Sequence, residues 1–552
     1  MKVTEKLQWG ETDSRQRREL YPVRIVRCFG EVRNHEALLL PKPNQITTKE
    51  SELTELRNNG GEEAAVLLDF GAEINGGLRI LGYTVEGDRY AQMQVTFGES
   101  VMEALSEIDE KNATNDHTPR AFSFLVPSFS DQTVGETGFR FVCVRLKGKS
   151  VKVSFKALHA VSVFRDIEYK GSFCCNDDLL NQIYDTAAYT CHLNMQRYVW
   201  DGIKRDRLVW VGDMHPEMLT IRTVFGVQPV MTETIRFARE TTPLPDFMNG
   251  FPTYSIWWLR ILWDWYYYTG DRDFLEENKD YAIGLIRQLA DDVGFDGSDT
   301  FDYDFLDWPT SGTPAGMQGV KGLLASGLEV FSKIATELGE IALAQECEKK
   351  LAAMRTRRYD PHGAKQTAAF LMLSGLAEEE KSAEMILEGG ARGMSTFMSY
   401  YILTAAAKKS MSGALAMLRE YYGGMLKMGA TSFWEDFDVE WLDNAAPIDE
   451  IVPEGKQDLH GDHGAYCYQG FRHSLCHGWS SAPTAFLAEK VLGIEIADIG
   501  CKKIRIRPDL GDLLWAKGTY PTPFGVITVS HRKQADGSIL TEVDAPKEME
   551  IL

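Results

Sequence analysis

The chain has 552 residues, more than one hydrophobic core normally serves, so several folding units are expected. Hydrophobic residues make up 44% and charged residues 25% of the chain, values that are typical of folded globular proteins and exclude a disordered or fibrous one. The formal net charge of -21 opposes binding to nucleic acid or to an anionic membrane, and no cluster of Lys and Arg is dense enough to overcome it.

The cellular compartment and the cofactors follow from what the sequence lacks. It shows no apolar leader near residue 1 and no run of about 18 apolar residues, so we expect a cytoplasmic protein that does not enter a membrane. A secreted or periplasmic protein would be expected if a signal had been removed. The nine cysteines are scattered without zinc-ribbon or C-x-x-C spacing, which favours buried free thiols and predicts no cofactor.

The first predicted domain, residues 1–170, is an antiparallel β-sandwich. From about residue 23 to 167 the sequence consists of short alternating runs, such as 92–97 and 139–146, separated by Gly, Asp and Asn. Residues 169–173 look like the last extended piece, and the Asn-Asp-Asp run that ends at Asp178 is suited to capping the first of many helices.

The second predicted domain, residues 171–495, is helical. Amphipathic stretches such as 322–336, 340–354 and 380–388 alternate with loops rich in Gly, Pro and Asp. About a dozen such stretches suit a ring of α-hairpins better than a four-helix bundle. We therefore expect a helical toroid whose loops at one end line a central cavity.

The third predicted domain, residues 496–552, is a small β-domain. Alternation returns at residues 503–507, 525–530 and 539–543. The order of strands, then helices, then strands contains no βαβ alternation, which disfavours a doubly wound parallel sheet.

Residues 200–217 concentrate the most chemistry. They place Asp, Lys and Arg side chains beside two tryptophans in a loop that leads to a helix. Carboxylates bind sugar hydroxyls and aromatic rings pack on the C–H faces of sugars, so this mixture suits carbohydrate recognition. A salt-bridged helix entrance would produce the same mixture.

Residues 429–438 hold a second carboxylate next to a tryptophan. Glu435 follows Phe433 and Trp434, and an apolar flank raises the pKa of a carboxyl group, which suits a proton donor or acceptor near neutral pH. The alternative is that Glu435 caps the following segment.

Residues 472–483 raise the question of a metal. His473 and His477 are spaced i,i+4, and His460, Asp462 and His463 lie nearby. The spacing matches no zinc pattern, so we expect no metal and favour a neutral His that hydrogen-bonds a sugar hydroxyl.

Two aromatic patches receive different interpretations. The tryptophans of residues 257–265 crowd one predicted helix and favour the core. Asp307 and Trp308 lie in a loop flanked by Gly and Pro, which favours a binding role.

At these residues the chain resembles the bacterial α-L-rhamnosidases of the glycoside hydrolase family 78 type. The resemblance covers most of the chain, including the closing segments 503–512 and 515–518. The family's Thr-Thr-x-Trp-Glu element is similar to residues 431–435, its Asn-His element to Cys476-His477, and its Gly-Asp-Trp loop to residues 306–308. The positions that match its acidic loop are Asp201, Arg205, Asp206, Trp210 and Asp213.

The resemblance implies a β-sandwich, an (α/α)6 toroid and a C-terminal β-domain, with an inverting mechanism. It implies Asp206 as the general acid and Glu435 as the general base. The implied substrate-binding residues are Asp201, Arg205, Trp210, Asp213, Asp307, Trp308, Trp434 and His477. The family usually has Glu where this chain has Asp206, and the shorter side chain loses about 1.5 Å of reach.

Three functions are therefore weighed. The first is hydrolysis of terminal α-L-rhamnosyl or related deoxysugar linkages. The second, motivated by Asp206, is a carbohydrate-binding protein or weak enzyme on the same fold. The third is another (α/α)6 enzyme, such as an unsaturated-uronyl hydrolase or a sugar phosphorylase. A carbohydrate is the expected partner, and a homodimer is an option.

Overall fold

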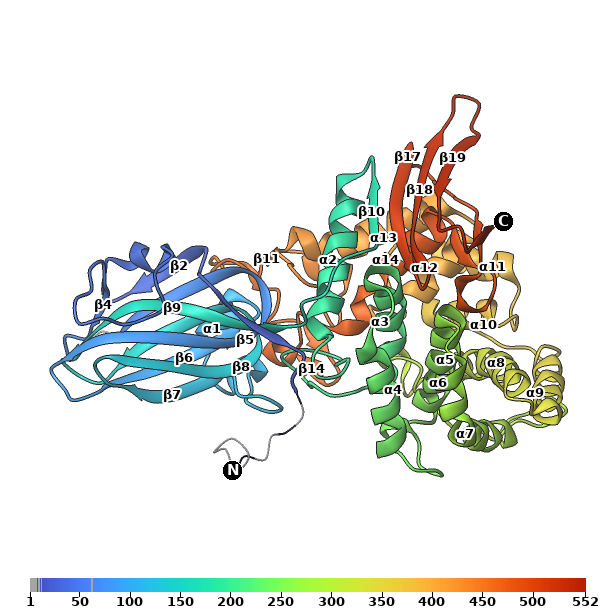
Figure 1. Cartoon of the computed structure of the whole chain (residues 1–552), viewed down its shortest axis with the longest axis horizontal. Coiled ribbons are helices and arrows are strands. Elements are labelled where there is room, and N and C mark those ends of the chain that lie inside the picture. Colours follow the sequence, from blue (N-terminus) through green and yellow to red (C-terminus); the bar gives the residue numbers. More distant parts are fainter. Residues whose placement is uncertain (1–6, 8–9, 11, 61–62) are drawn as a thin grey trace.

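The computed structural model describes residues 7, 10, 12–60 and 63–552. The prediction that no leader is present falls mostly on residues 1–11, largely outside this described part. The molecule is elongated, with a β-domain at one end and helices at the other (Figure 1). Among the described residues, no helix combines the length and the apolar character needed to cross a bilayer.

The N-terminal domain is an antiparallel β-structure with its own apolar core, as the alternating sequence predicts. Its strands are hydrogen-bonded in the order β3-β4-β9-β5-β8-β6-β7, with β1 on β9 and β2 on β5. The strands are β1 (Gln16–Leu20), β2 (Arg24–Phe29), β3 (Glu31–Arg33), β4 (Thr54–Arg57), β5 (Ala64–Glu86), β6 (Ala91–Gly98), β7 (Ala121–Val126), β8 (Ser130–Lys147) and β9 (Lys152–Phe164).

The long strand β5 pairs with β8 along one edge and with β9 along the other, and both pairings are interrupted by bulges. Glycine is required at one bend, because a Cβ on Gly77 would lie 2.1 Å from the carbonyl oxygen of Gly135. After β6, the short helix α1 (Val101–Leu105) and the turn η3 (Glu110–Asn112) begin an excursion toward the helical region. We refer to residues 106–120 as the β-domain loop.

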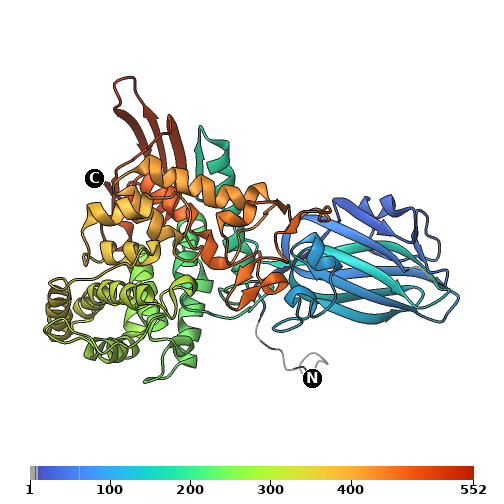
Figure 2. The same cartoon turned by 180° about the vertical axis from the view of Figure 1, so that it is seen from behind.

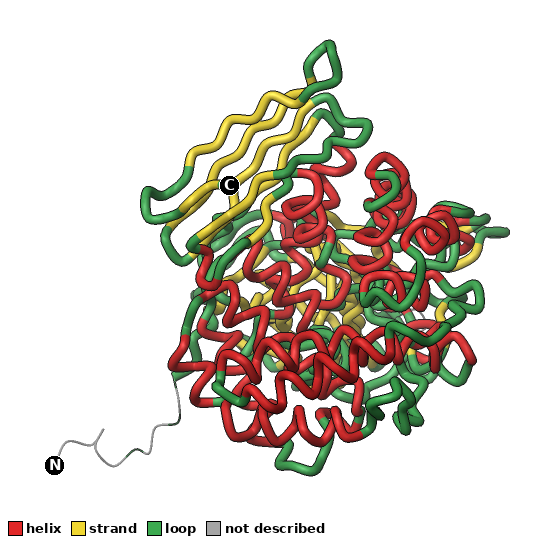
Figure 3. The backbone as a smooth tube through the Cα atoms, turned by 90° about the vertical axis from the view of Figure 1, so that its right-hand side faces the viewer, coloured by secondary structure: helices red, strands yellow, loops and turns green. Residues whose placement is uncertain are grey.

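The helical region is a closed ring of hairpins, which confirms the predicted toroid (Figure 3). Each inner helix contacts the next, and α14 contacts α3, which closes the ring. The inner helices are α3 (Met214–Thr220), α5 (Pro252–Thr269), α8 (Pro314–Glu337), α10 (Lys365–Leu373), α12 (Ser399–Ala407) and α14 (Pro483–Phe486). The outer helices are α2 (Asp178–Asn194), α4 (Pro229–Thr241), α7 (Lys279–Asp291), α9 (Ile341–Met354), α11 (Glu379–Leu387) and α13 (Met411–Lys427).

Local sequence explains individual helices. The Asp177 carboxylate accepts hydrogen bonds from the backbone N–H groups of Leu179 and Leu180, so the predicted cap begins α2. Helix α5 is apolar on nearly all sides, as expected for an inner helix, and its tryptophans are buried. They belong to the core, as predicted.

The C-terminal domain contains a four-stranded antiparallel sheet, visible against one side of the helices in Figure 2. It pairs β10 (Ser172–Cys175) with β17 (Trp515–Thr522), followed by β18 (Gly525–Lys533) and β19 (Ile539–Asp544). A smaller sheet joins β15 (Ile494–Ile496), β16 (Lys503–Ile506) and β20 (Glu550–Ile551).

The extended piece predicted before α2 forms β10, which pairs with β17 as an edge of the C-terminal sheet. Phe173 and Cys175 on β10 bury their side chains in the apolar core of the helices. This core runs without interruption through the toroid and the C-terminal domain. The β-domain has a separate core, and its junction with the toroid combines polar contacts with a small apolar cluster against which Ile451 packs.

Candidate active site

A cavity of about 260 Å³ opens at the end of the ring where the inner helices begin. Asp213 directly precedes α3, Tyr254 lies in the first turn of α5, and Trp479 precedes α14. Helix N-termini carry partial positive charge, so this end of the ring favours acidic groups. The lining residues are Asp201, Arg205, Asp206, Trp210, Asp213, Phe251, Tyr254, Phe305, Trp308, Glu435, Cys467, Arg472, His477 and Trp479.

Asp201 shapes the loop that carries the catalytic candidates. Its carboxylate accepts hydrogen bonds from the backbone N–H of Asp206 at 2.8 Å and of Leu208 at 2.9 Å. Burial, and then the neighbouring carboxylates of Asp213 and Asp206, raise the pKa of Asp201 to about 7 despite the opposing effect of His477. Asp201 therefore has a structural task besides any contact with a sugar.

Asp206 is held by three nitrogen groups. Oδ1 accepts a hydrogen bond from Arg205 Nη1 at 3.0 Å, and Oδ2 accepts one from Trp210 Nε1 at 3.1 Å. The third is His117 Nε2, which lies 3.3 Å from Oδ1 and comes from the β-domain loop. Nothing in the sequence around His117 indicated a site, because its proximity arises only when the β-domain packs against the toroid.

Glu435 lies in the same cavity as Asp206 and is joined to it by Arg205. Arg205 Nη2 donates to both carboxylate oxygens of Glu435, while Nη1 holds Asp206. One guanidinium that bonds both carboxyl groups keeps their nearest oxygens within roughly 8 Å. This upper limit on the distance is compatible with the separation of about 6.5–9.5 Å between the two carboxyl groups of inverting enzymes.

The surroundings of Glu435 favour its ionised form, which is the form that a general base needs. Burial by itself raises the pKa of Glu435, but the positive charge of Arg205 outweighs it and holds the pKa below the ordinary value of 4.5. The capping role considered for Glu435 is wrong, because the Asp438 carboxylate caps the next turn, η7 (Val439–Leu442), by accepting from the backbone N–H of Glu440 at 2.9 Å.

His477 is a cation in this setting. Its Nε2 lies 3.0 Å from Asp213 Oδ1. Burial opposes protonation, but the carboxylates of Glu435, Asp213 and Asp201 prevail and raise the pKa of His477 to about 9. The sequence favoured a neutral imidazole here, and the difference arises because three acidic side chains converge on it.

His473 has a different role. Residues 473–477 form no helix, so the i,i+4 metal pair does not arise. Instead, His473 Nε2 accepts a hydrogen bond from the backbone N–H of Asp436 at 2.9 Å. His460 Nε2 lies 2.9 Å from the carbonyl oxygen of His473.

Two predicted binding residues lie outside the cavity lining. Asp307 is buried and accepts hydrogen bonds from the Trp308 backbone N–H at 2.8 Å and from the Ser395 hydroxyl, so it positions Trp308, which does line the cavity. Trp434 is 1% exposed and packs edge-on against Phe437 in the apolar core, which corrects the expectation of direct contact with a sugar.

The remaining lining residues were not singled out from the sequence. They are Phe251, Tyr254, Phe305, Cys467, Arg472 and Trp479. Most are aromatic, and Trp308 packs edge-on against Phe305 with ring centroids 5.0 Å apart. The aromatic helix that contains Tyr254 offered a partial signal, but aromatic residues on inner helices are usually core.

Lys204 fixes the catalytic loop to the β-domain. Its Nζ lies 2.8 Å from Glu99 and 3.1 Å from Glu103, both fully buried, and donates to the carbonyl oxygens of Phe471 and His473. Glu99, Glu103 and His460 have ligand atoms close enough together to hold a metal ion. The ammonium of Lys204 supplies the positive charge between the two glutamates.

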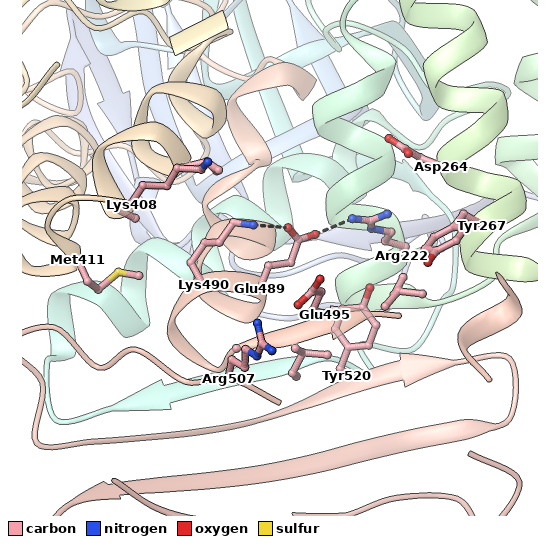
Figure 4. A pocket seen from close by; sticks show the side chains of 15 residues that line it. Arg222, Asp264, Tyr267, Lys408, Met411, Glu489, Lys490, Glu495, Arg507 and Tyr520 are labelled. Atoms are coloured by element: carbon pink, nitrogen blue, oxygen red, sulfur yellow. Dashed lines mark hydrogen bonds and ion pairs between the residues drawn. The ribbon is translucent and has the colours of Figure 1, made fainter. Parts of the chain in front are cut away.

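A second cavity, of about 440 Å³, lies near the other end of the inner helices (Figure 4). It is lined near the end of α5 by Asp264 and Tyr267, roughly 20 Å along that helix from Tyr254. Its Glu489 is neutralised by Arg222 at 2.6 Å and by Lys490 at 3.5 Å. Among the residues that line this second cavity, no Arg is hydrogen-bonded to two carboxyl groups, whereas Arg205 bonds both Asp206 and Glu435 in the first.

Comparison with known proteins identifies the domains that surround the first cavity. Residues 168–370 match the model of the bacterial alpha-L-rhamnosidase 6 hairpin glycosidase domain, and residues 493–551 match that of the bacterial alpha-L-rhamnosidase C-terminal domain. The first match includes Asp206 and ends before Glu435, so the pairing of the two rests on the geometry. An alpha-L-rhamnosidase of Formosa agariphila is 36% identical over 78 residues, which are 14% of this chain and 8% of that protein.

Solved structures share the fold. The family 78 rhamnosidase of Bacillus sp. GL1 superposes with a TM-score of 0.72 at 21% identity, covering 94% of this chain and 55% of its own. A rhamnosidase from Klebsiella oxytoca with rhamnose bound gives 0.63 at 19% identity, covering 86% and 96%. This chain thus spans about half the length of the Bacillus protein. It contains the six-hairpin glycosidase domain and the C-terminal domain of the bacterial α-L-rhamnosidases.

Proposed function

We propose that this protein is an inverting glycoside hydrolase that cleaves terminal α-L-rhamnosyl or related deoxysugar linkages. The observation that carries the proposal is the single guanidinium of Arg205, which joins the carboxyl groups of Asp206 and Glu435 in one cavity. The cavity volume of about 260 Å³ is just below the range of about 300–1,000 Å³ for drug-sized ligands, which suits one sugar ring. The rhamnose bound to the Klebsiella neighbour supports the choice of sugar.

In this mechanism Glu435 is the general base and Asp206 the general acid. Glu435, ionised because of Arg205, takes a proton from a water molecule whose oxygen attacks the anomeric carbon. The bond to the leaving oxygen breaks, and that oxygen receives the proton of the Asp206 carboxylic acid. His477 and Asp213 are placed to bind sugar hydroxyls, and Trp210 and Trp308 to pack on the ring.

An alkyl α-L-rhamnoside, whose leaving oxygen needs a proton, tests the assignment. Glu435→Gln should lower kcat by about 10³-fold or more, and Asp206→Asn by about 10²-fold or more, since each removes one proton transfer. Glu440→Gln is the matched control, because Glu440 is close in sequence but its side chain is 62% exposed. NMR of the first-formed sugar should show the β-anomer. Unchanged rates in both site variants would reject the hydrolase.

A second candidate is a carbohydrate-binding protein or a weak enzyme. It is motivated by Asp206, whose side chain is shorter than the family's usual Glu and is held in place by three nitrogen groups. Calorimetry with L-rhamnose beside a turnover assay separates the two, because binding without turnover supports this reading.

A further inference from the structure

The β-domain loop contacts the toroid at three successive points around the cavity. Lys111 forms ion pairs with Asp458 at 3.1 Å and Asp462 at 2.7 Å. Farther along the loop, Asp116 lies 3.2 Å from Nε of Arg472, which lines the cavity. His117 then reaches Asp206 itself.

The loop is held firmly at its far end, so the position of His117 is determined by the fold. The Arg120 side chain is 2% exposed and donates to the carbonyl oxygens of Phe97, Glu103 and Ser106. The Thr118 hydroxyl donates to the carbonyl oxygen of Glu136 at 3.0 Å. His117 has a φ of +61°, a left-handed conformation that is uncommon for a residue other than glycine.

The surroundings of His117 are suited to orienting an acid. Its Nε2 lies 3.3 Å from Asp206 Oδ1 and 3.7 Å from Asp116 Oδ2. Each of these two carboxylates also pairs with an arginine: Asp206 with Arg205, and Asp116 with Arg472. The side chains of His117 and Asp206 are 25% and 14% exposed, so both are largely shielded from solvent.

We propose that His117 is a positioning residue for Asp206, so that the active site is composite and incomplete without the β-domain. This inference rests on the proposed hydrolase function. Trp210 and Arg205 hold Asp206 from the toroid side, and His117 holds it from the β-domain side. Three contacts together fix the direction in which the carboxyl group faces the leaving oxygen.

The test uses two leaving groups in the full-length protein. A 4-nitrophenolate leaves with little help from an acid, whereas an alkoxide needs a proton. His117→Ala should therefore lower kcat about tenfold on an alkyl α-L-rhamnoside and less than threefold on 4-nitrophenyl α-L-rhamnoside, since it removes one of the three contacts to Asp206. His117→Gln, which keeps an N–H donor, should recover most of the alkyl activity.

Two controls make the result specific. His362→Ala changes an exposed histidine that also has a positive φ, of +49°, and lies away from the cavity; both activities should be unchanged. In an Asp206→Asn background, His117→Ala should have no further effect. An equal loss on both substrates, or a further loss in the Asp206→Asn background, would overturn the proposal. The proposed function is tested separately, by turnover of the wild type and by the loss of that turnover in Glu435→Gln.

Discussion

Two buried Arg–Glu pairs lie near opposite ends of the same ring of helices. Arg205 and Glu435 are 6% and 5% exposed at their side chains, and Arg222 and Glu489 are each 12% exposed. Burial of an ion pair therefore does not distinguish the two ends. Such pairs are common in protein interiors and are weak evidence of function.

The difference lies in what surrounds each pair. Arg205 is shared between two carboxyl groups, and Asp201 and Asp213 add further acidic side chains to the same cavity. Glu489, by contrast, pairs with two cations, Arg222 and Lys490 (Figure 4). It also accepts a hydrogen bond from the Tyr400 hydroxyl. The first cavity therefore has more carboxyl groups than cations, and carboxyl groups that share one cation acquire separate pKa values, which suits the proposed acid and base.

The largest effect is expected when each arginine is removed in turn. Without Arg205, the strongest influence that lowers the pKa of Glu435 is lost while burial remains, so we expect that pKa to rise and the base to be protonated over a wider range of pH. Arg205→Gln should lower kcat/KM by about 10²-fold or more and move the acid limb of its pH profile to higher pH.

Arg222→Gln is the matched control for this change. It removes the arginine of the other pair and should lower the melting temperature, since it leaves Glu489 short of a partner. Measured where both variants are folded by circular dichroism, it should leave the pH profile in place. A shifted limb in Arg222→Gln, or an unshifted one in Arg205→Gln, would contradict the contrast between the two ends.

A second effect concerns stability. The folded protein holds a proton on His477, whose pKa is raised to about 9, while the unfolded chain releases it near 6.5. This stabilisation is complete below pH 6.5 and is lost as the pH rises through 9, because the folded state then binds more protons than the unfolded one. Between these pH values the wild type should lose about 2–3 kcal/mol more than His477→Gln.

Denaturant melts at pH 6.5 and 9.5 measure this difference. His362→Gln, at an exposed position, should follow the wild type. Parallel losses in the wild type and in His477→Gln would show that the imidazole is not a cation in the folded protein.

The smallest effect separates two tryptophans. Trp210→Phe removes the donor to Asp206 Oδ2 and should lower kcat about tenfold. Trp434→Phe should change kcat less than threefold, because Trp434 lies outside the cavity and its indole N–H has no partner to lose. Steady-state kinetics measures both changes in kcat. A larger loss in Trp434→Phe than in Trp210→Phe would indicate that Trp434 contacts the substrate after all.

Local patterns in the sequence predicted much of the architecture. The alternating runs became strands β6 and β8, and the amphipathic stretches became α8, α9 and α11. These predictions succeed because the period of apolar residues reflects which face of one element is buried. Partners far away in the chain were harder to predict: β10 pairs with β17, which no pattern near residue 172 indicates.

The candidate site divides in the same way. Residues beside tryptophans in two acidic loops could be selected from the sequence, and Asp206 and Glu435 do line one cavity. The sequence could not show that Trp434 faces the core, because neighbouring residues of a loop point in different directions. Nor could it show His117, whose role depends on how two domains with separate cores pack together.

The sequence by itself determined the kinds of elements, their order and which side chains were available for chemistry. The tertiary structure decided which of those side chains meet and which of them carry charge. Arg205 lowers the pKa of Glu435 and three acids raise that of His477 only because segments far apart in the chain are brought together and buried. Coulomb interactions depend on the distance between charges, and desolvation depends on burial. The spacing of residues along the chain specifies neither that distance nor that burial.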